Sequence, residues 1–159
     1  MKTSIKKGFS FGLTSGIITT LGLMVGLYAT THSQTVVIGG ILTIAVADSL
    51  SDAMGMHISE ESDRKNTPKQ VWEATIATFL AKLVFALTFI IPVLLLTLDN
   101  AILVSILWGI SAIAIISYFL AREHKEKALH VILEHLVITI TVIVTTHLIG
   151  GAIGDIFGS

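Results

Sequence analysis

The sequence predicts an all-α polytopic membrane protein with five transmembrane helices and a cytoplasmic N-terminus. Hydrophobic residues make up 53% of the 159 residues and charged residues only 13%, whereas a soluble domain is about a quarter charged. The mean hydropathy is +0.86. Five apolar segments reach the length of about 20 residues that a bilayer crossing requires. These observations predict one transmembrane domain that occupies the whole chain, 1–159.

The five segments are expected at 8–31, 35–58, 71–97, 101–120 and 128–157. The first follows a basic start, as a secretory signal would. Its apolar run exceeds the usual signal length of about 7–15 residues, and no clean cleavage site follows it. We therefore expect it to be a retained span. Because the connections are short, consecutive helices must be antiparallel neighbours in one bundle.

The basic residues predict the orientation. Nine of the ten lysines and arginines precede the first span or lie in the second and fourth connections: Lys2, Lys6, Lys7, Arg64, Lys65, Lys69, Arg122, Lys125 and Lys127. The other two connections contain none. Because basic residues favour the cytoplasmic side, the N-terminus is predicted inside and the C-terminus outside an integral protein of the cell membrane. The tenth basic residue, Lys82, lies within the third segment.

Several function classes lack support in the sequence. The absence of cysteine excludes disulfides, thiolate metal sites and cysteine nucleophiles. The net charge of −1 and the lack of a dense basic cluster argue against a nucleic-acid partner. No nucleophile elbow, zinc-protease motif or phosphate-binding loop is present, so we expect neither an enzyme nor a prosthetic group.

Glycine spacing in the first span indicates close helix contacts. Gly12 and Gly16 form one GxxxG motif, and Gly22 and Gly26 form another. Such glycines allow either intramolecular packing or dimerisation. Two motifs on one helix favour a homodimer that packs through its first spans.

Two acidic residues, Asp48 and Asp52, lie inside the second span. With Met56 they follow one another at four-residue spacing and so share one helix face. Asp48 is expected about 14 Å from the cytoplasmic end and Asp52 about 8 Å. Carboxylates at such depth are costly and usually functional. Carboxylate and thioether ligands together suit a first-row divalent metal. The alternative is that the aspartates are neutral, or paired with Lys82, and only hold helices together.

Lys82 is expected at a depth of about 16 Å in the third span, where it must pair with an acid, lose its proton or extend to the membrane surface. Asp48, Asp52 and Glu134 are the acids at comparable depth. Pairing with an aspartate would make an exchange element, because an arriving cation could replace the ammonium group. A structural ion pair is the equally favoured alternative.

Other residues are candidate ligands or accessory groups. Glu134 in the fifth span is predicted to join the metal site, with His130 four residues earlier as an accessory. Glu60 and Glu61 could concentrate cations at the cytoplasmic entrance, and Glu73 could face the same entrance, although an acidic run is more often a solvated turn.

Three stretches together resemble the vacuolar iron transporter family. They are GLTSGIITTLGLMVGL, ADSLSDAMGMHISEES and TPKQVWEATIATFLAKLVFALTFIIPVLLL, the last with Pro68 and Pro92 in matching places. The resemblance implies a five-span dimer that exports Fe²⁺ or Mn²⁺ from the cytoplasm in exchange for protons. The family's acidic residue in the first span falls at Ser15, and its metal-binding glutamate in the second falls at Met56. The family's long cytoplasmic metal-binding domain is absent.

The combined hypothesis is a divalent metal transporter that exports Fe²⁺ or Mn²⁺ by proton antiport, with the metal as substrate. Its metal ligands would be Asp48, Asp52, Met56 and Glu134. Two alternatives remain. One is a membrane protein whose buried charges are structural. The other is a transporter of a different proton-coupled solute, which requires a wide cavity between the second and fifth spans.

Overall fold

The computed structural model describes residues 3–157, and every regular element in this range is an α-helix. The helices are α1 (Thr3–Thr31), α2 (Gln34–Ser62), α3 (Pro68–Thr88), α4 (Ile90–Leu95), α5 (Leu98–His124) and α6 (Ala128–Phe157). Within this range five spans are long and apolar enough to cross a membrane, with α3 and α4 forming one of them. The predicted all-α polytopic fold is therefore confirmed.

The third span was expected to be continuous over 71–97, but the helix is interrupted at Phe89, between α3 and α4. Pro92 explains the interruption. Proline has no backbone N–H, and its ring collides with the carbonyl four residues earlier, which is that of Thr88. Phe89 is fully buried at the break, so the core holds the bend in place.

Local sequence also determines where helices begin and end. α3 begins with a capping box, in which Thr67 and Gln70 bond reciprocally to each other's backbone, followed by Pro68 at the first helical position. α5 ends at His124, and the next residue, Lys125, caps it in a left-handed conformation with φ 58°. The spans are thus bounded by local chemistry as well as by the apolar pattern.

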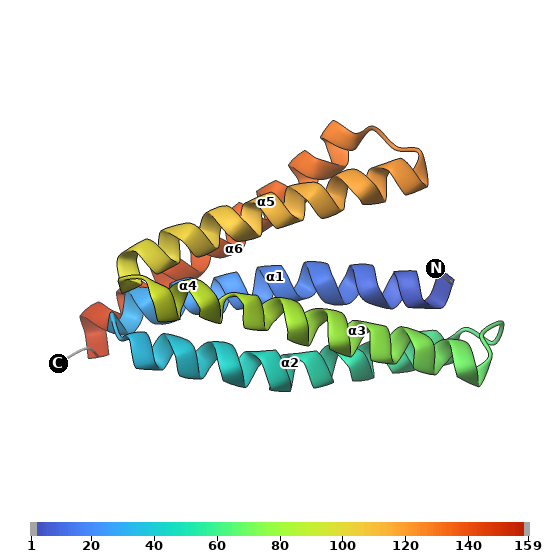
Figure 1. Ribbon diagram of the computed structural model, residues 1–159, viewed down its shortest axis with the longest axis horizontal. Coiled ribbons are helices and arrows are strands. Elements are labelled where there is room, and N and C mark those ends of the chain that lie inside the picture. Colours follow the sequence, from blue (N-terminus) through green and yellow to red (C-terminus); the bar gives the residue numbers. More distant parts are fainter. Residues whose placement is uncertain (1–2, 158–159) are drawn as a thin grey trace.

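Helix α1 is the centre of the bundle. It contacts α2, α3, α5 and α6, and in Figure 1 it runs between the α2–α3 pair and the α5–α6 pair. The N-terminal end of α1, the α2–α3 connection and the α5–α6 connection lie at one end of the molecule (Figure 1). The three basic segments of the sequence therefore share one end, as the alternating direction of consecutive spans requires.

The glycines of α1 pack against other helices of the same chain. A Cβ on Gly8 would lie 2.1 Å from the Ala74 carbonyl oxygen, and one on Gly12 would lie 2.3 Å from that of Thr78. Gly22 faces Val142 of α6 at 2.7 Å. The prediction that these spacings mark a dimer seam is therefore not supported, because the glycines let α1 pack against α3 and α6.

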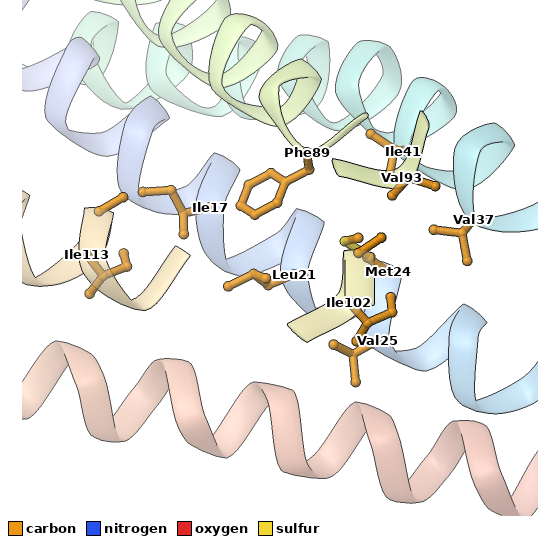
Figure 2. Packing of buried hydrophobic residues seen from close by; sticks show 12 residues of the cluster. Ile17, Leu21, Met24, Val25, Val37, Ile41, Phe89, Val93, Ile102 and Ile113 are labelled. Carbon is orange, nitrogen blue, oxygen red and sulfur yellow. The ribbon is translucent and has the colours of Figure 1, made fainter. Parts of the chain in front are cut away.

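The apolar core joins α1 to the other spans, and Leu136 and Ile143 of α6 pack against it. Figure 2 shows its side chains, which include Ile17, Leu21 and Met24 of α1. They meet residues from α2, α4 and α5, with Phe89 at the α3–α4 break. Large apolar side chains on the outside, such as Leu50 and Leu107, are more than half exposed, as lipid-facing positions should be.

Candidate functional site

Lys82 lies at the centre of a charged cluster formed by three helices. Its side chain comes from α3 and the residue is only 1% exposed. The ammonium nitrogen lies 2.5 Å from Asp48 Oδ2 and also contacts Asp52 Oδ2, both on α2. It donates to Ser15 Oγ of α1 at 2.9 Å, and Ser15 in turn donates to Asp52 Oδ2 at 2.6 Å. Of the three acids that the sequence left open as partners of Lys82, Asp48 and Asp52 both pair with it, whereas Glu134 is not part of the cluster.

The sequence around each residue explains how the cluster is assembled. The four-residue spacing places Asp48 and Asp52 on one face of α2. Gly16 allows α3 to approach, because a Cβ at that position would lie 3.1 Å from Lys82 Cγ. Ser15 is the neighbour of this glycine and so reaches the lysine from the same turn of α1. Glycine therefore makes the space that the long side chain occupies.

The cluster lies deep in the span and carries a net negative charge. Asp48 is the middle residue of the 29-residue α2. Two carboxylates and one ammonium leave a net charge of −1. The side chains of Asp48 and Asp52 are 27% and 21% exposed, whereas that of Lys82 is 2% exposed. Asp48 Oδ2 is buried and contacts the ammonium as an ion pair without a directed hydrogen bond.

Two more residues continue the same row of α2 towards the basic end. Met56 is one turn beyond Asp52 and is buried, at 8% exposed. Glu60 is one further turn along and is 3% exposed. Its carboxylate pairs with Lys7 of α1 and accepts a hydrogen bond of 3.1 Å from the Asn66 amide. We call Asp48, Asp52, Met56 and Glu60 the α2 row.

The accessory residues near this end have separate environments. Glu60 was predicted as a solvated entrance residue, but it is buried because Lys7 and Asn66 cover it. Glu61 is exposed and borders a small hollow of about 140 Å³ with His57 and Trp72. Glu73 accepts a hydrogen bond of 2.8 Å from Ser4.

The structure does not bring Glu134 to the aspartates, contrary to the prediction. Glu134 is exposed on α6 and borders a hollow with Glu126 and His135 beside α5. His130 is also exposed. The physical reason is that α6 packs against α1 and α5, so that α1 intervenes between α6 and the α2–α3 pair (Figure 1). Nor does this arrangement support a wide substrate cavity between the second and fifth spans.

Sequence reasoning missed Ser15 as a member of the cluster. It was considered only as a position that cannot supply charge, yet its hydroxyl links the ammonium to a carboxylate. A polar residue between Gly12 and Gly16 was the available signal, since glycines mark the face that touches another helix. Among the side chains that the structure describes, no group of three histidine, aspartate or glutamate residues is close enough to hold a metal. Any metal would therefore rely on two carboxylates with the hydroxyl, the thioether or water.

Comparison with known proteins does not assign the chain. No model of a known protein family matches it, and no curated protein matches it either. Its function must therefore be inferred from the geometry of the charged cluster.

Proposed function

We propose that the protein is a proton-coupled cation transporter that exports Fe²⁺ or Mn²⁺ from the cytoplasm. The observation that supports it best is the cluster of Asp48, Asp52, Ser15 and Lys82 at mid-span. Ionised groups within a membrane span are expensive and are characteristic of ion and proton pathways. Here two carboxylates share the ammonium group of Lys82, and an arriving ion could take the place of that ammonium.

The donor set suits the proposed cargo. Two aspartates and one serine offer hard oxygen ligands, and Met56 in the same row offers a soft thioether. Mixed hard and soft ligands suit first-row divalent ions better than Ca²⁺ or Mg²⁺, which take all-oxygen shells. In the export cycle the metal binds between Asp48 and Asp52 from the cytoplasmic side. Protonation of the same carboxylates from the outer side then releases it.

A homodimer forms part of this proposal, with its interface on α2 rather than α1. Small residues occupy every fourth position on one exposed face of α2: Gly39, Thr43, Ala47, Ser51 and Gly55. A Cβ on Gly39 or Gly55 would meet nothing within 4 Å, so this face is free to receive another helix. It lies beside the α2 row, and a second copy there would cover the partly exposed carboxylates, which lipid cannot solvate.

Oligomeric state in detergent tests the interface. Gly55→Leu should convert the dimer to monomer, because the larger side chain separates two closely packed helices. Gly151→Leu on α6 is the matched control, since Gly151 also has open space around its Cβ position. Dimers that survive both substitutions would place the interface elsewhere.

Metal flux tests the transport function. Purified protein is reconstituted into liposomes that contain a metal-sensitive fluorophore, and Fe²⁺ and Mn²⁺ fluxes are measured with and without a pH gradient. We expect gradient-driven flux in the wild type and at least a roughly hundredfold loss in Asp48→Asn and Asp52→Asn, since each removes a charged ligand. Asp155→Asn, at the exposed far end of α6, should retain full flux.

A structural role for the charges is the second candidate, because Lys82 connects α1, α2 and α3 through its three partners. It predicts no flux of either metal from folded wild-type protein. It also predicts that apolar replacement of Lys82 together with the aspartates leaves the fold intact. Gradient-driven flux that depends on Asp48 would exclude it.

A further inference from the structure

Every acidic residue of the α2 row is already paired with a lysine from another helix. Lys82 of α3 holds Asp48 and Asp52, and Lys7 of α1 holds Glu60. Both lysines thus place an ammonium group where a transported cation would have to bind. In the sequence the lysines lie far from these acids, and only the fold brings each lysine to its partner.

We propose that these two lysines are tethered competing cations that make the α2 row selective for divalent over monovalent ions. The inference rests on the proposed transport function and names the residues that determine its ion selectivity. In the resting protein the lysines occupy the carboxylates, and an ion gains access only by displacing them.

Charge explains why displacement would discriminate between ions. A monovalent ion that replaces the Lys82 ammonium gains no more Coulomb attraction from Asp48 and Asp52 than the lysine loses. A divalent ion gains about twice the attraction from each carboxylate. A tethered group also competes at an effective concentration in the millimolar range or above, without ever diffusing away. Sodium and potassium would therefore be excluded, while a divalent metal could still enter.

The two lysines differ in how readily an arriving ion can displace their ammonium groups from the carboxylates. The side chain of Lys7 is 60% exposed, so its ammonium can move into water when an ion reaches Glu60. That of Lys82 is 2% exposed and is held by three oxygen atoms. Lys7 would thus contribute weakly to the selection of divalent over monovalent ions at the cytoplasmic end. Lys82 would contribute most of this selectivity at mid-span.

Competition by sodium during manganese flux tests the proposal. Flux is measured in liposomes with sodium chloride or with the chloride of a bulky organic cation at equal ionic strength. For the wild type we expect the two fluxes to agree within about twofold, and for Lys82→Gln we expect sodium to lower the flux about tenfold. Because each protein is compared with itself, a smaller folded fraction cannot produce the difference. Equal fluxes for folded Lys82→Gln would overturn the inference.

A second variant covers the case in which Lys82→Gln does not fold. Asp48→Asn/Lys82→Gln keeps the net charge of −1 but has no ammonium group. It should take up radioactive sodium about tenfold faster than Asp48→Asn, which has the same ligands but keeps the ammonium group. Sodium uptake no faster than that of Asp48→Asn would overturn the inference.

A milder effect should appear at the other lysine. Lys7→Gln should increase the inhibition by sodium about twofold, whereas Lys6→Gln should not, because Lys6 pairs with Glu123 of α5 outside the row. Equal effects of the two substitutions would remove Lys7 from the proposal.

If wild-type protein carries neither Mn²⁺ nor Fe²⁺, the proposed function fails and this inference with it. If the wild type carries a divalent metal but sodium does not lower the flux of Lys82→Gln, the proposed function stands and only this inference is overturned.

Discussion

The α1–α2–α3 region and the α5–α6 region are both built from long apolar helices, but only the first encloses a fully buried lysine within the described residues, Lys82. Of the most apolar window of α1, 44% is buried, against 11% for α6. Polar contacts of the second region, such as Ser117 with His135 at 2.7 Å, lie towards its basic end. Apolar composition alone therefore does not decide where a membrane protein can keep a charge.

The position of the closest helix contacts accounts for the difference. Gly8 and Gly12 bring α1 directly onto the α3 backbone in the turns before Lys82, whereas α1 and α6 come equally close at the opposite end of the bundle, where a Cβ on Gly150 would lie 2.3 Å from the Gly26 carbonyl oxygen. Close backbones leave no room for lipid or water beside Lys82, so its ammonium must be matched by protein carboxylates. On the α6 side no such enclosure is required, because the exposed residues there are mostly apolar and face lipid.

The largest expected effect comes from removing the positive charge that pairs with the two aspartates. Lys82→Met should lower the free energy of unfolding by about 3–5 kcal/mol, because it leaves two carboxylates without their cation. Lys6→Met, which breaks the exposed pair with Glu123, should cost at most about 1 kcal/mol. Unfolding in mixed detergent micelles of increasing denaturing fraction measures both. Similar losses would mean that burial of Lys82 contributes nothing.

A smaller effect tests the backbone contact itself. Gly12→Ala should destabilise by about 1–3 kcal/mol, because the added Cβ would lie 2.3 Å from the Thr78 carbonyl oxygen. Gly151→Ala on α6 has open space and should be neutral or slightly stabilising, since alanine favours helix. The same unfolding measurement distinguishes them, and a neutral Gly12→Ala would show that α1 and α3 can separate with little loss of stability.

Removing the hydroxyl that connects the charges should cost less. Ser15→Ala loses one hydrogen bond from Lys82 and one to Asp52, and we expect a loss of about 1.5 kcal/mol because both partners still contact each other. Ser111→Ala, on an exposed position of α5, should change stability by less than about 0.5 kcal/mol. A loss at Ser15 no greater than at Ser111 would exclude it from the cluster.

The smallest expected effect concerns the N-terminal caps of α3 and α5, one helix from each region. Thr67→Ala removes the capping box of α3 and should cost about 1 kcal/mol. Thr97 occupies the corresponding position of α5 but makes no side-chain cap bond, so Thr97→Ala should change stability by less than about 0.5 kcal/mol. Helical content followed by circular dichroism during heating compares the two. Equal shifts would mean that the cap is not formed in detergent.

Much of the fold was accessible from the sequence because its determinants are local. The five spans follow from apolar length, and the common end of the basic connections follows from the alternating direction of consecutive spans. The α2 row was partly predictable, since four-residue spacing alone places Asp48, Asp52 and Met56 on one face. The break at Phe89 was missed, although Pro92 was noted, because proline is tolerated within membrane helices when neighbours satisfy the freed groups.

Residue order was enough to establish that this chain is helical, that it has five segments able to cross a membrane and that Lys82 needs a partner or a route to water. Packing of the helices was needed to show which acids pair with Lys82, that Ser15 joins them and that Glu134 lies elsewhere. It also showed that the glycines of α1 pack against α3 and α6, which leaves the small-residue face of α2 open. Periodicity defines the faces of each helix, whereas which faces meet depends on close packing of the whole bundle.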